Sequence, residues 1–228
     1  MHQVRSELLK MRTTRTVAVL LAAAAALTLL GACVEALSRT VEKLAVVLLS
    51  TLMGLITVTS EFRYGTIRPT LLFEPRRRRV LAAKLAVSAL AGSVFGLVCG
   101  AVSFGAGLSI LAARNVDPAL TGPHTLALLL GPLGASALGA MLGVAIGALI
   151  RNQVGAVVAV AAYAFAVDAV VFSAAPSIGR YLPGKASDAL AGLPTAHLVT
   201  PALGAALYAA WALAFLAAAT VRNDRSDV

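Results

Sequence analysis

Long apolar runs separated by short polar stretches make up most of the chain from residue 16 onward. A helix needs about 20 apolar residues to cross the hydrocarbon core of a bilayer. Six segments approach or exceed that length, at residues 16–37, 41–59, 82–112, 125–150, 154–174 and 203–221. The second has the shortest uninterrupted apolar run, because Glu42 and Lys43 lie at its start. The pattern predicts an all-α polytopic membrane protein in which residues 1–228 form a single transmembrane domain.

The composition agrees with this class. Hydrophobic residues make up 59% of the 228 residues and charged residues only 13%, whereas a soluble domain carries about 25% charged residues. The net charge of +9 would suggest nucleic acid in a soluble protein. In so apolar a chain we attribute it to the positive-inside rule and expect no nucleic-acid partner. The two cysteines, Cys33 and Cys99, lie in apolar runs and do not indicate a disulfide framework.

The Lys and Arg residues are distributed unequally between the two sides that six spans would define. Fourteen fall at the termini and in the second-to-third and fourth-to-fifth connections, and five fall in the other connections. Basic residues are enriched in cytoplasmic segments. We therefore expect both termini to lie in the cytoplasm.

Residues 1–15 precede the first expected span and carry Val4, Leu8 and Met11 on one helical face. This spacing predicts a short interfacial helix among lipid headgroups; the alternative is a frayed basic tail. Residues 30–33 read Leu-Gly-Ala-Cys, like a lipoprotein cleavage site ending at Cys33. We expect an uncleaved first span, because five more spans follow, but cleavage would remove that helix.

Glycine recurs every fourth residue in two of the expected spans. The positions are Gly92, Gly96 and Gly100 in the third and Gly139, Gly143 and Gly147 in the fourth. Such stripes let helix backbones approach closely. We expect them to pack against each other or against a second copy of the chain. The alternative is that they let helices slide during a transport cycle.

Asp168 is the ionisable residue well inside a span, where a carboxylate is costly and usually has a partner. We expect a structural pair with Arg180 in the next connection; the alternative is a place on a substrate pathway. That connection, residues 175–201, is rich in Pro and Gly and predicts an external re-entrant segment of broken helices. Its GRYLPGK string resembles a P-loop, but Ala186 stands where Ser or Thr would coordinate magnesium.

Residues 61–84 form a charged island between the second and third expected spans and contain seven of the nineteen Lys and Arg residues. Gly65 permits a turn, and Pro75 suits the first turn of a new helix. We predict a short cytoplasmic coupling helix within residues 60–80, followed by a basic anchor. The arginines at the start of the next helix oppose its dipole, so anionic lipid headgroups or acidic groups on a partner must favour them.

The stretch SEFRYGTIRPTLLFEPRRRRVLAAK, residues 60–84, resembles the segment between helices two and three of ABC type-2 permeases, the membrane subunits of bacterial ABC exporters. The matching residues are Glu61, Gly65, Thr66, Pro75, Arg76, Arg77, Arg78, Arg79 and Lys84. The six spans, the interfacial helix and the broken external segment also fit this family. One feature departs from the family's pattern: the first external connection, residues 38–40, is shorter than we would expect.

The resemblance implies a mechanism. The coupling helix would dock on a separate ATPase subunit, and ATP-driven closure of two such subunits would switch a pair of permeases, a homodimer or a heterodimer with a paralogue, from inward- to outward-open. The residues that would contact the ATPase or shape the coupling element are Glu61, Arg63, Gly65, Thr66 and Arg68, and the anchor would consist of residues 75–79 and Lys84. ATP and Mg²⁺ would bind the partner, and this chain, in the bacterial plasma membrane, would bind no cofactor and be no enzyme by itself.

Two other functions remain open. An ATP-independent secondary transporter would need more intramembrane carboxylates than Asp168 alone. A membrane scaffold or immunity protein would transport nothing. The cargo is not specified by the sequence, although spans rich in Ala, Leu, Val and Gly favour an apolar or amphiphilic drug, lipid or peptide.

Overall fold

The structure is a computed structural model, and it describes residues 19, 22, 23, 26, 38–66, 72, 77–113, 115, 122–193 and 197–224. Within these residues the fold is entirely helical. The predictions for several segments lie outside the described residues, namely the expected interfacial helix (residues 1–15), most of the first expected span including Cys33, and Arg68, Pro75 and Arg76. Five helical segments in the described part are long and apolar enough to cross a membrane, so a multi-pass membrane protein is indicated.

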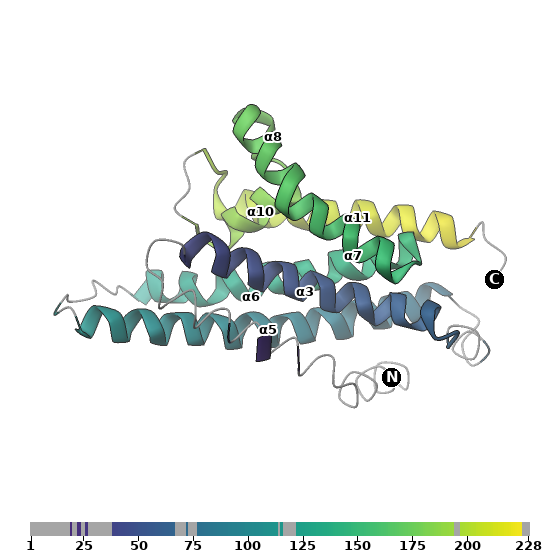
Figure 1. Cartoon of the computed structure of the whole chain (residues 1–228), viewed down its shortest axis with the longest axis horizontal. Coiled ribbons are helices and arrows are strands. Elements are labelled where there is room, and N and C mark those ends of the chain that lie inside the picture. Colours follow the sequence, from purple (N-terminus) through teal and green to yellow (C-terminus); the bar gives the residue numbers. More distant parts are fainter. Residues whose placement is uncertain are drawn as a thin grey trace.

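Three long helices run side by side along the molecule: α3 (Ser38–Arg63), α5 (Arg77–Ala113) and α6 (Gly122–Ile150) (Figure 1). Each extends past the apolar run that predicted it, because backbone hydrogen bonding continues into the flanking residues while hydropathy marks only the apolar part. At about 1.5 Å per residue, the 37 residues of α5 exceed the hydrocarbon thickness by a wide margin.

The remaining helices lie on the other side of α3 and α6. The fifth expected span consists of α7 (Gln153–Ala162), a π-helical turn η1 (Tyr163–Val167) and α8 (Asp168–Ala174), which continue one another. Two short helices follow, α9 (Pro176–Gly179) and α10 (Pro183–Leu190), and then α11 (Pro201–Asp224). Figure 1 shows α8 leaning away from the long helices, whereas α11 runs beside them.

Two short helices lie within the described part of residues 175–201. The α9 and α10 helices have four and eight residues, and each begins with a proline at its first turn. One face of α10 is buried, and the Cβ position of Gly204 on α11 lies against its backbone. Protein therefore covers α10, whereas Pro176, Ser177 and Ile178 of α9 are exposed.

The glycine stripes pack helices of one chain together. A Cβ on Gly92 or Gly96 of α5 would lie 2.5 Å from a backbone carbonyl oxygen of α6, whereas Gly100 is less tightly packed. A Cβ on Gly143 of α6 would overlap the carbonyl oxygen of Thr51 in α3, and one on Gly147 would lie 2.9 Å from that of Leu55. The two stripes therefore face different neighbours, with α6 between α5 and α3.

The third member of the α6 stripe, Gly139, has a different environment. Its Cβ position lies about 3 Å from the hydroxyl oxygens of Ser50, Thr51 and Tyr208. The missing side chain leaves room for these polar groups from α3 and α11 to meet inside the bundle. Gly54 of α3, which belongs to neither glycine stripe, is the counterpart of Gly143. A Cβ on Gly54 would overlap the carbonyl oxygen of Ala140 in α6.

Several helix ends meet at one end of the bundle, where α3 ends and α5 begins (Figure 1). Arg63 at the end of α3 donates a hydrogen bond of 3.4 Å to Gln153 at the start of α7. Arg222 near the end of α11 donates one of 2.6 Å to the carbonyl of Leu149. Arg151, in the short α6–α7 connection, lies over the ring of Phe62 at 5.6 Å. We call this the arginine end of the bundle.

Candidate functional site

A buried ion pair joins α3 and α5 at the arginine end. The Lys84 Nζ lies 2.9 Å from the Glu61 Oε1, and the two residues are 2% and 6% exposed. Val58 and Leu81, one turn away on the two helices, belong to a buried apolar cluster. Attraction between opposite charges is stronger in so apolar a setting than in water. The pair therefore fixes the end of α3 to the first turns of α5.

An exposed turn, residues 64–66, projects just beyond this pair. Gly65 has a φ of +69°, a left-handed conformation that glycine adopts without strain. Tyr64 is 72% exposed, and the Arg63 guanidinium lies 5.7 Å from its ring centroid. Arg63, Gly65 and Thr66, three of the expected coupling residues, are therefore on the surface.

Burial distinguishes between the roles expected for two of these residues. Glu61 is buried beneath the turn, so of its two expected roles it can shape the coupling element but cannot contact a partner protein. Lys84 is also buried and bonded to Glu61, so it cannot anchor the helix to lipid headgroups as expected. Arg78 and Arg79 are exposed, as an anchor requires. The sequence could not separate these roles, because burial depends on which face of α5 meets α3 and α6.

A second site is a partly open cavity of about 290 Å³ between helices of the chain. Residues of α3, α6, α7, η1, α8, α10 and α11, with Leu182 before α10, form its wall. Most of the wall is apolar, and the polar groups come mainly from η1, α8, α10 and α11. The lining residues are Val47, Leu48, Thr51, Leu142, Ile146, Ile150, Ala159, Val160, Tyr163, Ala164, Asp168, Leu182, Pro183, Gly184, Ser187, Asp188, Tyr208, Trp211 and Phe215.

The π-helical turn determines how Asp168 faces this cavity. The Asp168 N–H bonds to the carbonyl of Tyr163, five residues earlier, so the helix is locally wider than an α-helix. Residues five apart lie well apart around an α-helix, but this turn brings Tyr163 and Asp168 onto the same side. The Tyr163 hydroxyl donates a hydrogen bond of 3.2 Å to the Asp168 Oδ1. Single π-turns in helices occur frequently at functional sites.

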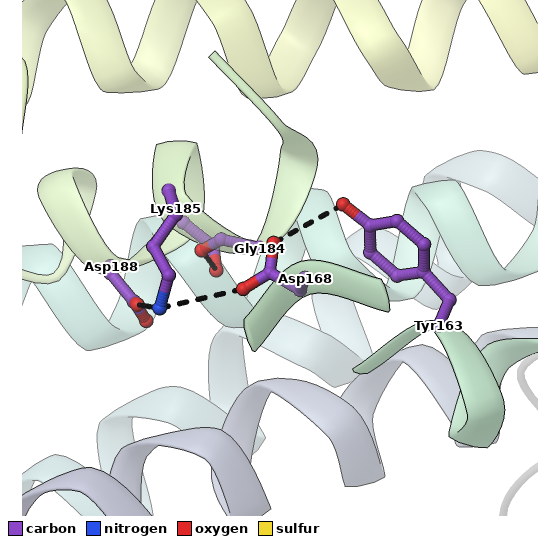
Figure 2. Close-up of polar contacts among 6 residues, drawn as sticks. Tyr163, Asp168, Gly184, Lys185 and Asp188 are labelled. Atoms are coloured by element: carbon purple, nitrogen blue, oxygen red, sulfur yellow. Dashed lines mark hydrogen bonds and ion pairs between the residues drawn. The ribbon is translucent and has the colours of Figure 1, made fainter. Parts of the chain in front are cut away.

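The ion pair of Asp168 is made by Lys185 of α10. Its Nζ lies 3.4 Å from the Asp168 Oδ2 and 3.0 Å from the Asp188 Oδ2 (Figure 2). We call these three residues the carboxylate–lysine cluster. The expected pair between Asp168 and Arg180 is therefore wrong: the guanidinium of Arg180 lies over the Tyr181 ring, 4.8 Å from its centroid. Arg180 is nearer to Asp168 in sequence, but Gly184 and Lys185 at the start of α10 are the residues that lie against the Asp168 carboxylate.

Electrostatics keep Lys185 charged. Burial lowers the pKa of its ammonium group, but the carboxylates of Asp188 and Asp168 outweigh burial, and the pKa is raised above its ordinary value. Gly184 allows the close approach, since a Cβ at this position would overlap the Asp168 carboxylate. One ammonium ion is thus held between two carboxylates from two helices.

Lys185→Met should destabilise the protein more than Arg180→Met. Among the described residues, removal of Lys185 leaves the buried carboxylate of Asp168 with the Tyr163 hydroxyl as its hydrogen-bond partner, and we expect this to cost about 2 kcal/mol. Thermal unfolding in detergent, followed by size-exclusion chromatography, measures both variants. An unfolding temperature lowered equally by the two substitutions would contradict the pairing.

This site is only partly predictable from the sequence. Lys185 and Asp188 stand three residues apart, which is the spacing of a helical ion pair. From the sequence, Lys185 was considered only as part of the P-loop-like string, and no ion pair was predicted for it. Tyr163, Gly184 and Trp211 carried no indication, because their roles depend on the π-turn and on the packing of α10 and α11.

No model of a known protein family matches the sequence, and no curated protein matches it. The geometry of the exposed turn and of the cavity, together with the resemblance of residues 60–84, is what supports a function.

Proposed function

We propose that this chain is the permease subunit of an ATP-driven exporter in a bacterial plasma membrane. It would act with two ATPase subunits, which bind ATP and Mg²⁺, and with a second permease copy or a paralogue. Its cargo would be apolar or amphiphilic. The proposal rests on the resemblance of residues 60–84 to ABC type-2 permeases and on the geometry of the arginine end.

The observation that supports it best is an exposed turn braced by a buried ion pair. A segment that receives force from a partner must be accessible and must be rigidly connected to the helices that it moves. The 64–66 turn is exposed, and the Glu61–Lys84 pair directly behind it links α3 to α5. Force applied there would reach two helices together, and α6 is packed against both.

The proposed orientation has the arginine end in the cytoplasm. Three helix ends and one connection meet there, and they carry Arg63, Arg77, Arg78, Arg79, Arg151 and Arg222. The opposite end has fewer basic residues in its described part, namely Arg39 and Lys43 at the start of α3, Arg180 and Lys185. This asymmetry supports a cytoplasmic turn and C-terminus under the positive-inside rule.

Co-purification tests the proposal. The tagged chain, extracted in mild detergent from its native host, should carry an ATP-binding cassette protein in equal amount. Arg63→Glu combined with Tyr64→Ala should reduce that recovery about tenfold, because it removes an exposed charge and an exposed aromatic ring from the docking surface. Arg222→Glu, also exposed at this end but on α11, is the matched control and should leave recovery unchanged.

The result must be specific to the turn. Wild-type and variant chains should elute at the same volume in size-exclusion chromatography, which separates lost docking from lost folding. A chain that yields no ATP-binding cassette protein, or one whose recovery is insensitive to the turn, would exclude the proposed coupling.

A secondary transporter is the second candidate, and the carboxylate–lysine cluster favours it. Asp168 and Asp188 both line the cavity, and Lys185 is paired with both of them; buried ionisable groups can form proton relays. Transport that follows a proton gradient without ATP, and that Asp168→Asn abolishes, would support this candidate over the first.

A further inference from the structure

We infer that the intramolecular cavity binds a hydrophobic molecule carrying a single positive charge. The binding itself follows from the cavity. The identification of that molecule as the exported cargo rests on the proposed function.

The apolar wall determines the body of the ligand. Val47 and Leu48 of α3, Ile146 of α6, Val160 of α7 and Phe215 of α11 are among the groups that face the space. The volume of about 290 Å³ is roughly twice that of a cavity of about 150 Å³ that holds benzene. A one- or two-ring aromatic body with small substituents fits this volume.

The charged groups at the wall determine the charge of the ligand. Among the described lining residues the formally charged ones are Asp168 and Asp188, both carboxylates, while Lys185 contacts them without lining the space. Two carboxylates and one ammonium ion give the cluster a formal charge of −1. A cation entering the cavity would face the carboxylates in an apolar setting, where the attraction is weakly screened.

Aromatic rings add to the preference for a cation. Tyr163, Tyr208, Trp211 and Phe215 all line the cavity, and ring faces attract ammonium groups. Figure 2 shows Tyr163 and Asp168 side by side, with Asp188 on the other side of Lys185. A cationic group near Asp168 would meet carboxylate and aromatic partners together, whereas an anionic ligand would be repelled.

The chain contains its own reporter for this test. Trp211 is the one tryptophan of the sequence and lies in the cavity wall. Its indole N–H is bonded to the carbonyl of Tyr181 at 2.9 Å, which holds the ring in place. A bromine atom quenches tryptophan fluorescence only at short range, so a brominated ligand in the cavity should quench Trp211.

The probes are 4-bromobenzyltrimethylammonium and its uncharged isostere 1-bromo-4-neopentylbenzene. They are titrated into the purified full-length chain in nanodiscs of zwitterionic lipid, without ATP or any partner protein. We expect saturable quenching by the cation, with affinity about tenfold higher than that of the isostere. Asp188→Asn should remove most of this tenfold preference and leave the isostere unaffected, which also shows that the cavity is intact.

Steric variants locate the quenching. Ala164→Phe introduces a ring at the cavity wall and should abolish saturable quenching by both probes. Ala101→Phe makes the same change at an exposed position of α5, which does not line the cavity, and should have no effect.

Three results would overturn the inference. Equal affinity for cation and isostere would exclude charge selection. Saturable quenching that survives Ala164→Phe would place the ligand elsewhere. In nanodiscs made with brominated lipid, if the lipid chains quenched Trp211 and the cation did not relieve that quenching, the occupant of the cavity would be lipid. Because no ATPase is present, these results are independent of co-purification, so binding and the proposed transport function can fail separately.

Discussion

Gly143→Ala is expected to force α6 away from α3 and to destabilise the protein by about 3 kcal/mol. A methyl group at this position would overlap the carbonyl oxygen of Thr51 and lie 2.9 Å from the Leu55 amide nitrogen. Both are backbone atoms, so relief requires a shift of a whole helix rather than of a side chain. Since α6 lies between α3 and α5, the shift would disturb both contacts. Thermal unfolding in detergent measures the effect.

Gly134→Ala on the same helix is the matched control. Its Cβ would meet side-chain atoms of Leu190 at 3.7 Å or more, which is ordinary contact. Alanine is the better helix former by about 1 kcal/mol, so this variant should be as stable as the wild type or more so. Gly54→Ala, on the α3 side of the contact, should behave like Gly143→Ala. A Gly143→Ala protein as stable as the wild type would show that α3 and α6 lie farther apart than the structure indicates.

Lys84→Met is expected to cost about 3–5 kcal/mol, because it leaves the carboxylate of Glu61 buried without its ammonium partner. Glu61→Gln should cost less, since an amide can still accept a hydrogen bond from Lys84. The exchanged pair, Glu61→Lys with Lys84→Glu, should recover part of the loss, because it restores opposite charges between the same two helices. Folded yield and unfolding temperature in detergent report all three.

Arg79→Met provides the comparison for Lys84→Met. Both remove a basic side chain from the first turns of α5, but Arg79 is exposed, and most exposed substitutions change stability by about 0.5 kcal/mol or less. If the exchanged pair were no more stable than Lys84→Met, attraction between residues 61 and 84 would not explain their burial.

Much of the architecture could be predicted from the sequence. Within the described residues, helices occupy the positions of the second to sixth expected spans, and residues 175–193 form short helices. These features depend on local properties, namely the length of an apolar run and the positions of Pro and Gly. The π-turn at Tyr163 was not predicted, because the same apolar sequence can form either an α-helix or a π-helix.

The candidate sites could be predicted only in part. The sequence indicated that residues 61–66 and Asp168 are unusual, because charge is costly in or beside apolar helices. It did not indicate that Glu61 and Lys84 bond to each other, or that Lys185 rather than Arg180 reaches Asp168. Both pairs join different helices, and their formation depends on how each helix is rotated and where it crosses its neighbour.

The sequence by itself therefore determined the class of this protein: a chain of apolar helices with basic residues concentrated at one set of connections, since hydropathy and charge act residue by residue. The tertiary structure decided which glycine meets which backbone, which carboxylate meets which cation, and that a cavity with two acidic groups remains between the helices. These outcomes follow from packing among residues far apart in the chain, whose relative positions no local pattern fixes.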